Sequence, residues 1–69
     1  MKVIKVLISW DDVNRMERLA DDLNGNDDIA ALCVAEDEYY IATEGARSMD
    51  FVRNALDRTL FDYTVKKIK

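Results

Sequence analysis

The chain has 69 residues, of which 49% are apolar and 35% charged, with one cysteine, two glycines and neither histidine nor proline. This length predicts one globular domain over residues 1–69, which buries only about 60% of the surface of its unfolded chain. A lone cysteine excludes an internal disulfide and a CxxC metal site, and the lack of histidine excludes Ser-His and Cys-His catalysis.

The first third of the chain predicts a strand followed by a helix. Residues 2–10 are rich in β-branched residues, and their side chains are expected to alternate between two faces, as in a half-buried strand. The face expected to point into the core holds Ile4, Val6, Ile8 and Trp10. Asp11 and Asp12 then suit a helix N-cap. Apolar residues at helical spacing predict a helix over 12–24, which Asn24-Gly25 ends because glycine accepts the left-handed conformation of many C-caps.

The remaining residues predict a hairpin, a second helix and a last strand. The apolar run 29–35 is typical of a strand covered on both faces, and the acids at 36–38 form a tight turn into a strand over 39–43. Ser48 is a suitable N-cap for a helix over 48–61. A strand over 63–68 follows, with lysines that are typical of an exposed edge.

The order βαββαβ predicts an α+β, ferredoxin-like two-layer sandwich. Two interlocking right-handed βαβ units give a four-stranded antiparallel sheet with both helices on one face. We expect the first and third strands at the centre of the sheet and the second and fourth at its edges.

The net charge of −4 conceals a strong asymmetry along the chain. Residues 11–44 carry eleven acids and two arginines (−9), residues 45–69 carry three acids and six bases (+3), and Lys2 and Lys5 add +2. The predicted topology gathers acids at one end of the sheet, where Asp62 also lies. Such an end repels nucleic-acid phosphates and attracts a basic protein surface, so we expect a protein partner and no direct binding of nucleic acid or membrane.

The candidate partner-binding residues are acids and aromatics at that end of the sheet. They are Trp10, Asp11, Asp12, Glu36, Asp37, Glu38 and Tyr39. Tryptophan is favoured at the centre of protein interfaces, and the acids are expected to supply the surrounding charge. The alternative interpretation is that the acids are caps, turn residues and a solvated face, while Trp10 closes the core.

Other chemistry has weaker support in the sequence. Asp11 and Asp12 with Glu36 or Glu38 offer oxygen ligands for a divalent cation, but no regular ligand spacing or phosphate loop is present, so we expect neither cofactor nor catalysis. Cys33 is expected in the core, and an unpaired cysteine indicates a cytoplasmic protein. The outer sheet face, with Val3, Lys5, Leu7 and Tyr40, is expected to support a homodimer or a protein contact. The basic-aromatic pattern of RNA-binding sheets is absent.

The segment from Ser9 to Leu19, SWDDVNRMERL, resembles the first loop and helix of heavy-metal-associated domains. In that family a strand leads into a CxxC loop and a helix, and Phe61-Asp62-Tyr63 stands where the family often has a Gly-Tyr step into its last strand. The resemblance implies the ferredoxin-like fold. The metal-binding cysteines of the family would fall at Ser9 and Asp12, so metal transport is not implied.

These observations favour a small protein-binding module without catalysis. Its size and acidity are similar to those of inhibitors encoded by phages and mobile elements, including anti-CRISPR and DNA-mimic proteins, which occupy a basic surface of their target. The alternative is a small-ligand or divalent-metal-binding regulatory domain that dimerises through its sheet. A third interpretation is a designed chain or a structural fragment without a partner.

Overall fold

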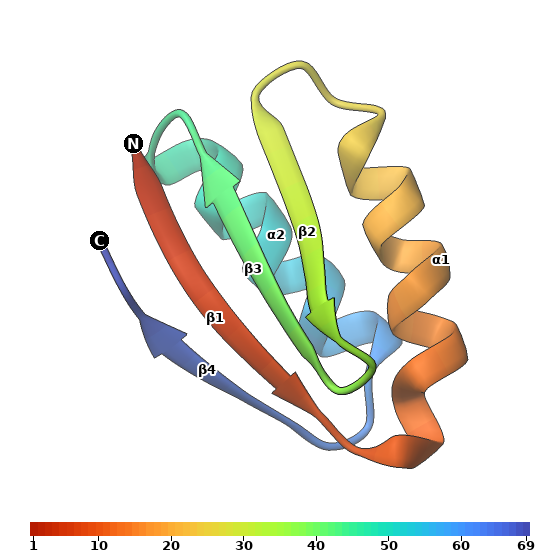
Figure 1. Cartoon of the computed structure of the whole chain (residues 1–69). Helices are drawn as coiled ribbons and strands as arrows, with labels where there is room; N and C mark the ends of the chain where they lie inside the picture. The colour runs from red at the N-terminus through yellow and green to blue at the C-terminus, as the bar shows by residue number, and fades with distance from the viewer.

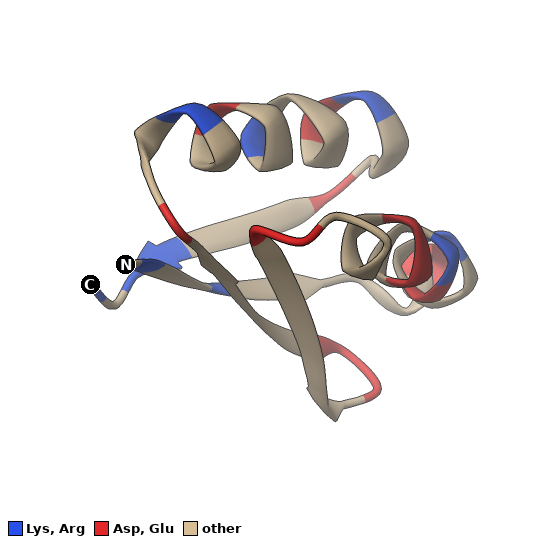
Figure 2. Ribbon diagram, turned by 90° about the horizontal axis from the view of Figure 1, so that it is seen from above, with Lys and Arg blue, Asp and Glu red and all other residues tan.

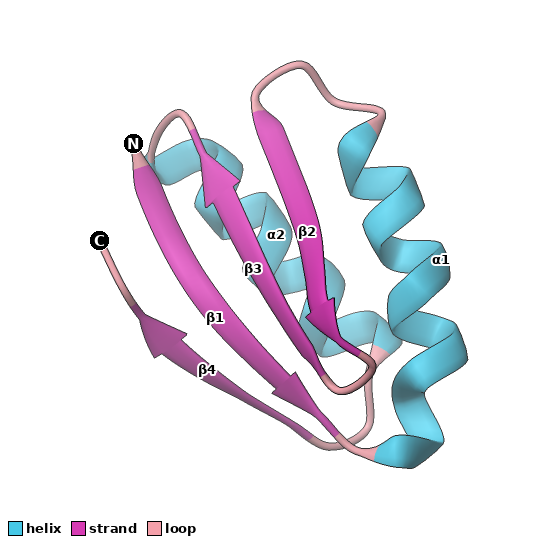
Figure 3. Cartoon of the chain, in the orientation of Figure 1, coloured by secondary structure: helices cyan, strands magenta, loops and turns pink.

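The computed structural model describes all 69 residues, in the order β1-α1-β2-β3-α2-β4 (Figures 1 and 3). The helices are α1 (Val13–Asn24) and α2 (Ala46–Thr59). The strands are β1 (Lys2–Ile8), β2 (Ile29–Ala35), β3 (Glu38–Thr43) and β4 (Tyr63–Lys67). A 3₁₀ turn, Trp10–Asp12, joins β1 to α1.

The four strands form one sheet in the order β2-β3-β1-β4, and every neighbouring pair is antiparallel. Both helices cover the same face of this sheet (Figure 1). The fold is therefore the predicted ferredoxin-like α+β sandwich, with β1 and β3 at the centre. Neither helix has the length and apolar character that a membrane span requires.

The core lies between the helices and the inner face of the sheet, as the periodicity of the sequence predicts. Met16 of α1, Leu56 of α2, Val6 of β1 and Ile41 of β3 have no exposed surface. Side chains at helical spacing pack onto alternate residues of the central strands, so both helices, β1 and β3 each bury one face. The buried helix residues are Met16, Leu19, Ala20, Leu23, Met49, Val52, Ala55 and Leu56.

Strand β2 is far more exposed than predicted. Only Ile29 is buried and Ala31 half-buried, whereas Leu32, Cys33 and Val34 are exposed. The cause is its position at the sheet edge, together with an irregularity in its pairing with β3 between Cys33 and Ala35. Figure 2 shows the β2–β3 hairpin extending away from both helices. The expectation that Cys33 lies in the core was wrong.

The ends of the helices also differ from the local predictions. Gly25 closes α1 with a right-handed φ of −73°, and its N–H donates to the carbonyl oxygen of Asp22. Helix α2 begins at Ala46, two residues before Ser48, whose hydroxyl donates instead to the Asp28 carboxylate. It ends at Thr59, because Leu60 is already extended. Phe61 therefore lies outside the helix.

The side chain of Asn24 connects the end of α1 to the edge strand β2 through two hydrogen bonds. Its Nδ2 donates to the carbonyl oxygen of Ala31 at 3.0 Å, and its Oδ1 accepts the Ala31 N–H at 2.7 Å. The amide thus satisfies both backbone groups of Ala31, which the free edge of β2 leaves without a neighbouring strand.

We predict that Leu56→Ala lowers the free energy of unfolding by about 2–5 kcal/mol, because it opens a cavity in the core. Leu32→Ala makes the same chemical change at a side chain that is 63% exposed, and its cost is expected to stay below about 1 kcal/mol. Urea denaturation of both variants measures the difference. Equal losses would contradict this assignment of the core.

Candidate functional site

Three connections of the chain meet at the end of the sheet where the acids were predicted to gather, which we call the acidic end. The 3₁₀ turn follows β1, the Glu36–Asp37 turn joins β2 to β3, and residues 60–62 lead from α2 into β4. The N–H of Ile8 donates to the carbonyl oxygen of Asp37 at 2.9 Å, and that of Ser9 donates to Asp62 at 3.2 Å. The prediction that topology gathers these segments is confirmed.

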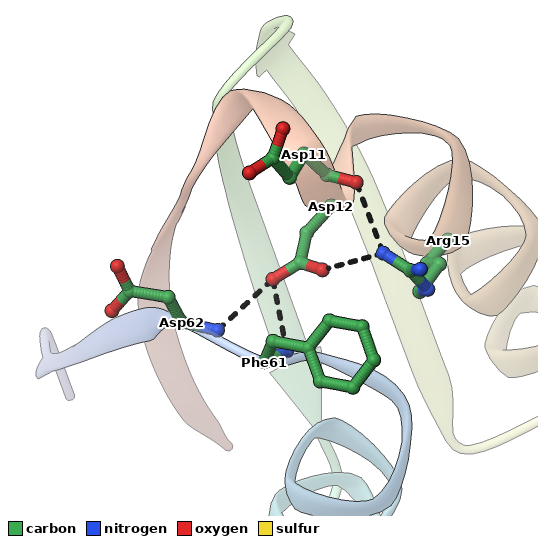
Figure 4. A network of polar contacts seen from close by, with 5 residues as sticks. All are labelled: Asp11, Asp12, Arg15, Phe61 and Asp62. Atoms are coloured by element: carbon green, nitrogen blue, oxygen red, sulfur yellow. Dashed lines mark hydrogen bonds and ion pairs between the residues drawn. The ribbon is translucent and has the colours of Figure 1, made fainter.

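A buried carboxylate joins two of the three connections. Asp12 has no exposed surface, and its Oδ2 accepts the backbone N–H groups of Phe61 and Asp62, each at 3.0 Å. These residues lie 49 and 50 positions further along the chain. Figure 4 shows the carboxylate of Asp12 pointing at both amides, while those of Asp11 and Asp62 point away from it.

Arg15 completes what we call the Asp12 network, formed by Asp12, Arg15, Phe61 and Asp62. Its guanidinium lies 3.0 Å from Asp12 Oδ1 and donates to the carbonyl oxygen of Asp11 at 3.0 Å. The same guanidinium stacks 4.4 Å from the centre of the Phe61 ring. A cation over an aromatic face is attracted to it, so Arg15 also restrains the ring.

These hydrogen bonds determine the ionisation of Asp12. The backbone N–H of Asp62 contributes most to lowering its pKa below the usual 3.8, and Phe61 and Arg15 lower it further. Burial opposes the shift, because it disfavours the charged form. The side chain is therefore a carboxylate at neutral pH, and its charge is compensated within the network.

Two large aromatic side chains protrude from this end. Trp10 is 68% exposed and Phe61 is 79% exposed. The alternative that Trp10 closes the core was wrong, because β1 ends at Ile8 and the 3₁₀ turn redirects residue 10. Phe61 was not among the predicted site residues. The available signal was its position, directly after Leu60, which already completes the apolar stripe of the second helix.

The predicted acids of the site differ in exposure. Asp11 and Glu36 are exposed, whereas Asp37 and Glu38 are half-buried. Asp62, which was predicted at the same end but not as a site residue, is also exposed. Glu38 lies 3.9 Å from the Lys5 ammonium, which reduces its availability to a partner. The carboxylates open to a partner are therefore mainly Asp11, Glu36 and Asp62.

Two predicted partner-binding residues have structural positions instead. The carboxylate of Asp12 is buried and makes no side-chain cap of α1. Tyr39 is only 4% exposed and points into the core, where burial raises the pKa of its phenol to about 12. Neither side chain is accessible to a partner, because strand alternation and the Asp12 network direct both inward.

This end contains no group of three carboxylates, thiols or imidazoles placed to hold a metal ion, and neither does the rest of the chain. No family model, curated protein or solved structure matches the chain. What the acidic end offers chemically is two apolar aromatic surfaces beside solvated negative charge. That combination is suited to molecular contact.

We predict that Asp12 makes the stability of the fold depend on acid pH. Its pKa is lower in the folded chain than the 3.8 of an ordinary aspartate, so this carboxylate stabilises the fold above pH 3.8. The stabilisation is lost as the pH falls through the lowered pKa. Thermal unfolding between pH 7 and pH 2.5 measures this loss.

Asp12→Asn removes the charge, and the variant is expected to unfold at least about 5 °C below the parent at pH 7. The difference should shrink below pH 3.8, since the parent then loses its own carboxylate. Asp11→Asn is the matched control, because Asp11 is exposed. Equal effects of the two substitutions at every pH would refute the role assigned to Asp12.

Proposed function

We propose that the protein binds another protein through its acidic end and acts without catalysis. The observation that supports this most is the exposure of Trp10 and Phe61 within one hydrogen-bonded corner of the fold. Isolated exposed apolar residues are ordinary, but two protruding aromatics in one corner form a contact patch. Trp is also strongly enriched among residues that dominate binding energy.

The rigidity of the corner favours binding. Trp10 belongs to a 3₁₀ turn that closes with a hydrogen bond from the Asp12 N–H to the carbonyl oxygen of Ser9. The backbone of Phe61 is held by Asp12 and its ring by Arg15. A turn backbone and a ring that are already held in place lose less conformational entropy when a partner binds.

The chemistry of the partner follows from the surrounding charge. Asp11, Glu36 and Asp62 are exposed on the three connections that meet at this end, so a complementary surface is basic with an apolar cavity. We propose that the protein inhibits its target by occupying such a surface, as small acidic inhibitors of the anti-CRISPR and DNA-mimic kind do. Attraction between opposite charges accelerates association and weakens as salt rises.

The charge requirement is tested by capture from a lysate of the encoding organism, followed by affinity measurement on the retained protein. We predict that Asp11→Lys/Glu36→Lys/Asp62→Lys abolishes capture at moderate salt. The control Asp21→Lys/Asp22→Lys/Glu44→Lys reverses three exposed acids elsewhere. Both changes move the net charge from −4 by +6 to +2. Equal losses in the two variants would show that only net charge matters and would contradict the proposed site.

The aromatic requirement is tested with the same partner. Trp10→Ala and Phe61→Ala are each expected to weaken binding at least about 30-fold, which corresponds to about 2 kcal/mol. Phe51→Ala is the control, since Phe51 is an exposed aromatic of α2. If all three variants bind as the parent does, the aromatic pair is not the interface.

A second candidate function is self-association through the open face of the sheet. Leu7 and Leu32 are exposed there, and the cross-strand register places Tyr40 between Leu32 and Lys5. Sedimentation equilibrium distinguishes this candidate. A dimer that Leu32→Lys dissociates would support it, whereas a monomer at the highest concentrations would exclude it.

A further inference from the structure

A basic groove lies between α2 and the β1–β4 edge of the sheet, at the end opposite the aromatic pair. Its volume is about 260 Å³, and it opens to solvent. The basic residues around it are Lys2, Arg53, Lys67 and Lys69. Figure 2 shows the basic end of β4 beside the N-terminus of the chain and beneath the first half of α2.

The cations of the groove come from β1, from α2 and from the C-terminal end of β4 with the residues after it. Lys67 pairs with the buried Ile4 across the β1–β4 ladder, so its side chain emerges on the helix-covered face. Lys66 pairs with Lys5 and emerges on the open face. The Lys69 N–H donates to the carbonyl oxygen of Val3 at 3.1 Å, which holds this end of the chain along β1. Arg53 approaches the groove from α2.

None of the four cationic side chains forms an ion pair. The ion pairs of the structure with a separation of 4.0 Å or less are Lys5–Glu38 and Arg15–Asp12. Asp50 is the single acidic residue that lines the groove, so the lining side chains sum to +3. In a chain whose net charge is −4, this concentration of unpaired positive charge creates a local potential that attracts anions.

We propose that this groove binds a small anion that carries one or more phosphate groups. The guanidinium of Arg53 offers a planar fork that matches two phosphate oxygens, and the lysines offer mobile ammonium groups. Ile4, Ala46 and Met49 provide an apolar floor for the remainder of the ligand. This binding site is independent of the protein interface proposed at the opposite end.

The dimensions and the surrounding charge select a small ligand over a nucleic acid. The groove is slightly smaller than the about 300–1,000 Å³ of pockets that enclose drug-sized molecules. A polynucleotide would extend beyond the groove, and the charged side chains outside the lining sum to −7, since the whole chain carries −4 and the lining +3, so the rest of the surface repels phosphates. A ligand of one or two phosphates with a small apolar part fits within the basic lining.

Isothermal titration calorimetry with inorganic pyrophosphate and with ADP, at constant ionic strength, tests the proposal. We predict saturable binding that weakens at least tenfold in Arg53→Gln and in Lys67→Gln. The matched controls are Arg58→Gln on α2 and Lys66→Gln on the open face of β4, which remove the same charge outside the groove. Their affinities are expected to stay within twofold of the parent. Unchanged thermal midpoints verify folding, since all four side chains are exposed.

The outcomes separate a binding site from general attraction between charges. ADP that binds more tightly than pyrophosphate indicates a nucleotide-like ligand in contact with the apolar floor, and equal affinities indicate that the phosphates alone are recognised. Equal weakening in all four variants, or no saturable binding of either probe at millimolar concentration, would overturn the proposal.

Discussion

The ion-paired and hydrogen-bonded carboxylate of Asp12 determines the shape of the end on which the proposed interface is built. A buried charge is stable only when its hydrogen-bonding capacity is filled, and here two backbone amides and Arg15 fill it. This requirement connects the turn after β1 to the segment after α2. Trp10 lies in the first of these connections and Phe61 in the second, so the network that satisfies Asp12 holds Phe61 at the surface and joins its segment to the turn that carries Trp10.

The molecule is electrically polar along its central strand. Strand β1 begins at Lys2, in the basic groove, and its end leads into the acidic turn that carries Trp10. The neighbouring strands bring the acids of the hairpin turn to one end and the lysines of β4 to the other. The exposed acids Asp27, Asp28 and Glu44 lie beside the start of β2 and the end of β3, so the positive charge of the second end is confined to the β1–β4 edge. A net charge of −4 therefore describes neither end. A domain of this size can thus offer two separate surfaces of opposite charge.

Features of the fold that depend on local pattern were predictable from the sequence. The alternation of apolar residues in β1 and their helical spacing in α1 and α2 indicate which face of each element is buried. The order of the elements then permits only a few topologies. The direction of Trp10 was not predicted, because the alternation of the first strand was extended to residue 10, whereas β1 ends at Ile8 and a 3₁₀ turn begins at Trp10. The local sequence predicted Asp12 as a helix N-cap, but its carboxylate instead accepts hydrogen bonds from the distant Phe61 and Asp62 amides. The exposure of β2 was also missed: the element order correctly placed this strand at an edge, but its apolar run predicted that both of its faces are covered.

The most direct test of this account is an NMR titration of the Phe61 and Asp62 amide protons between pH 7 and pH 2. If Asp12 accepts both hydrogen bonds, the two resonances shift together with a single midpoint below 3.8, and both amides are protected from exchange with solvent. Two unrelated midpoints, or rapid exchange at neutral pH, would contradict the central role of Asp12.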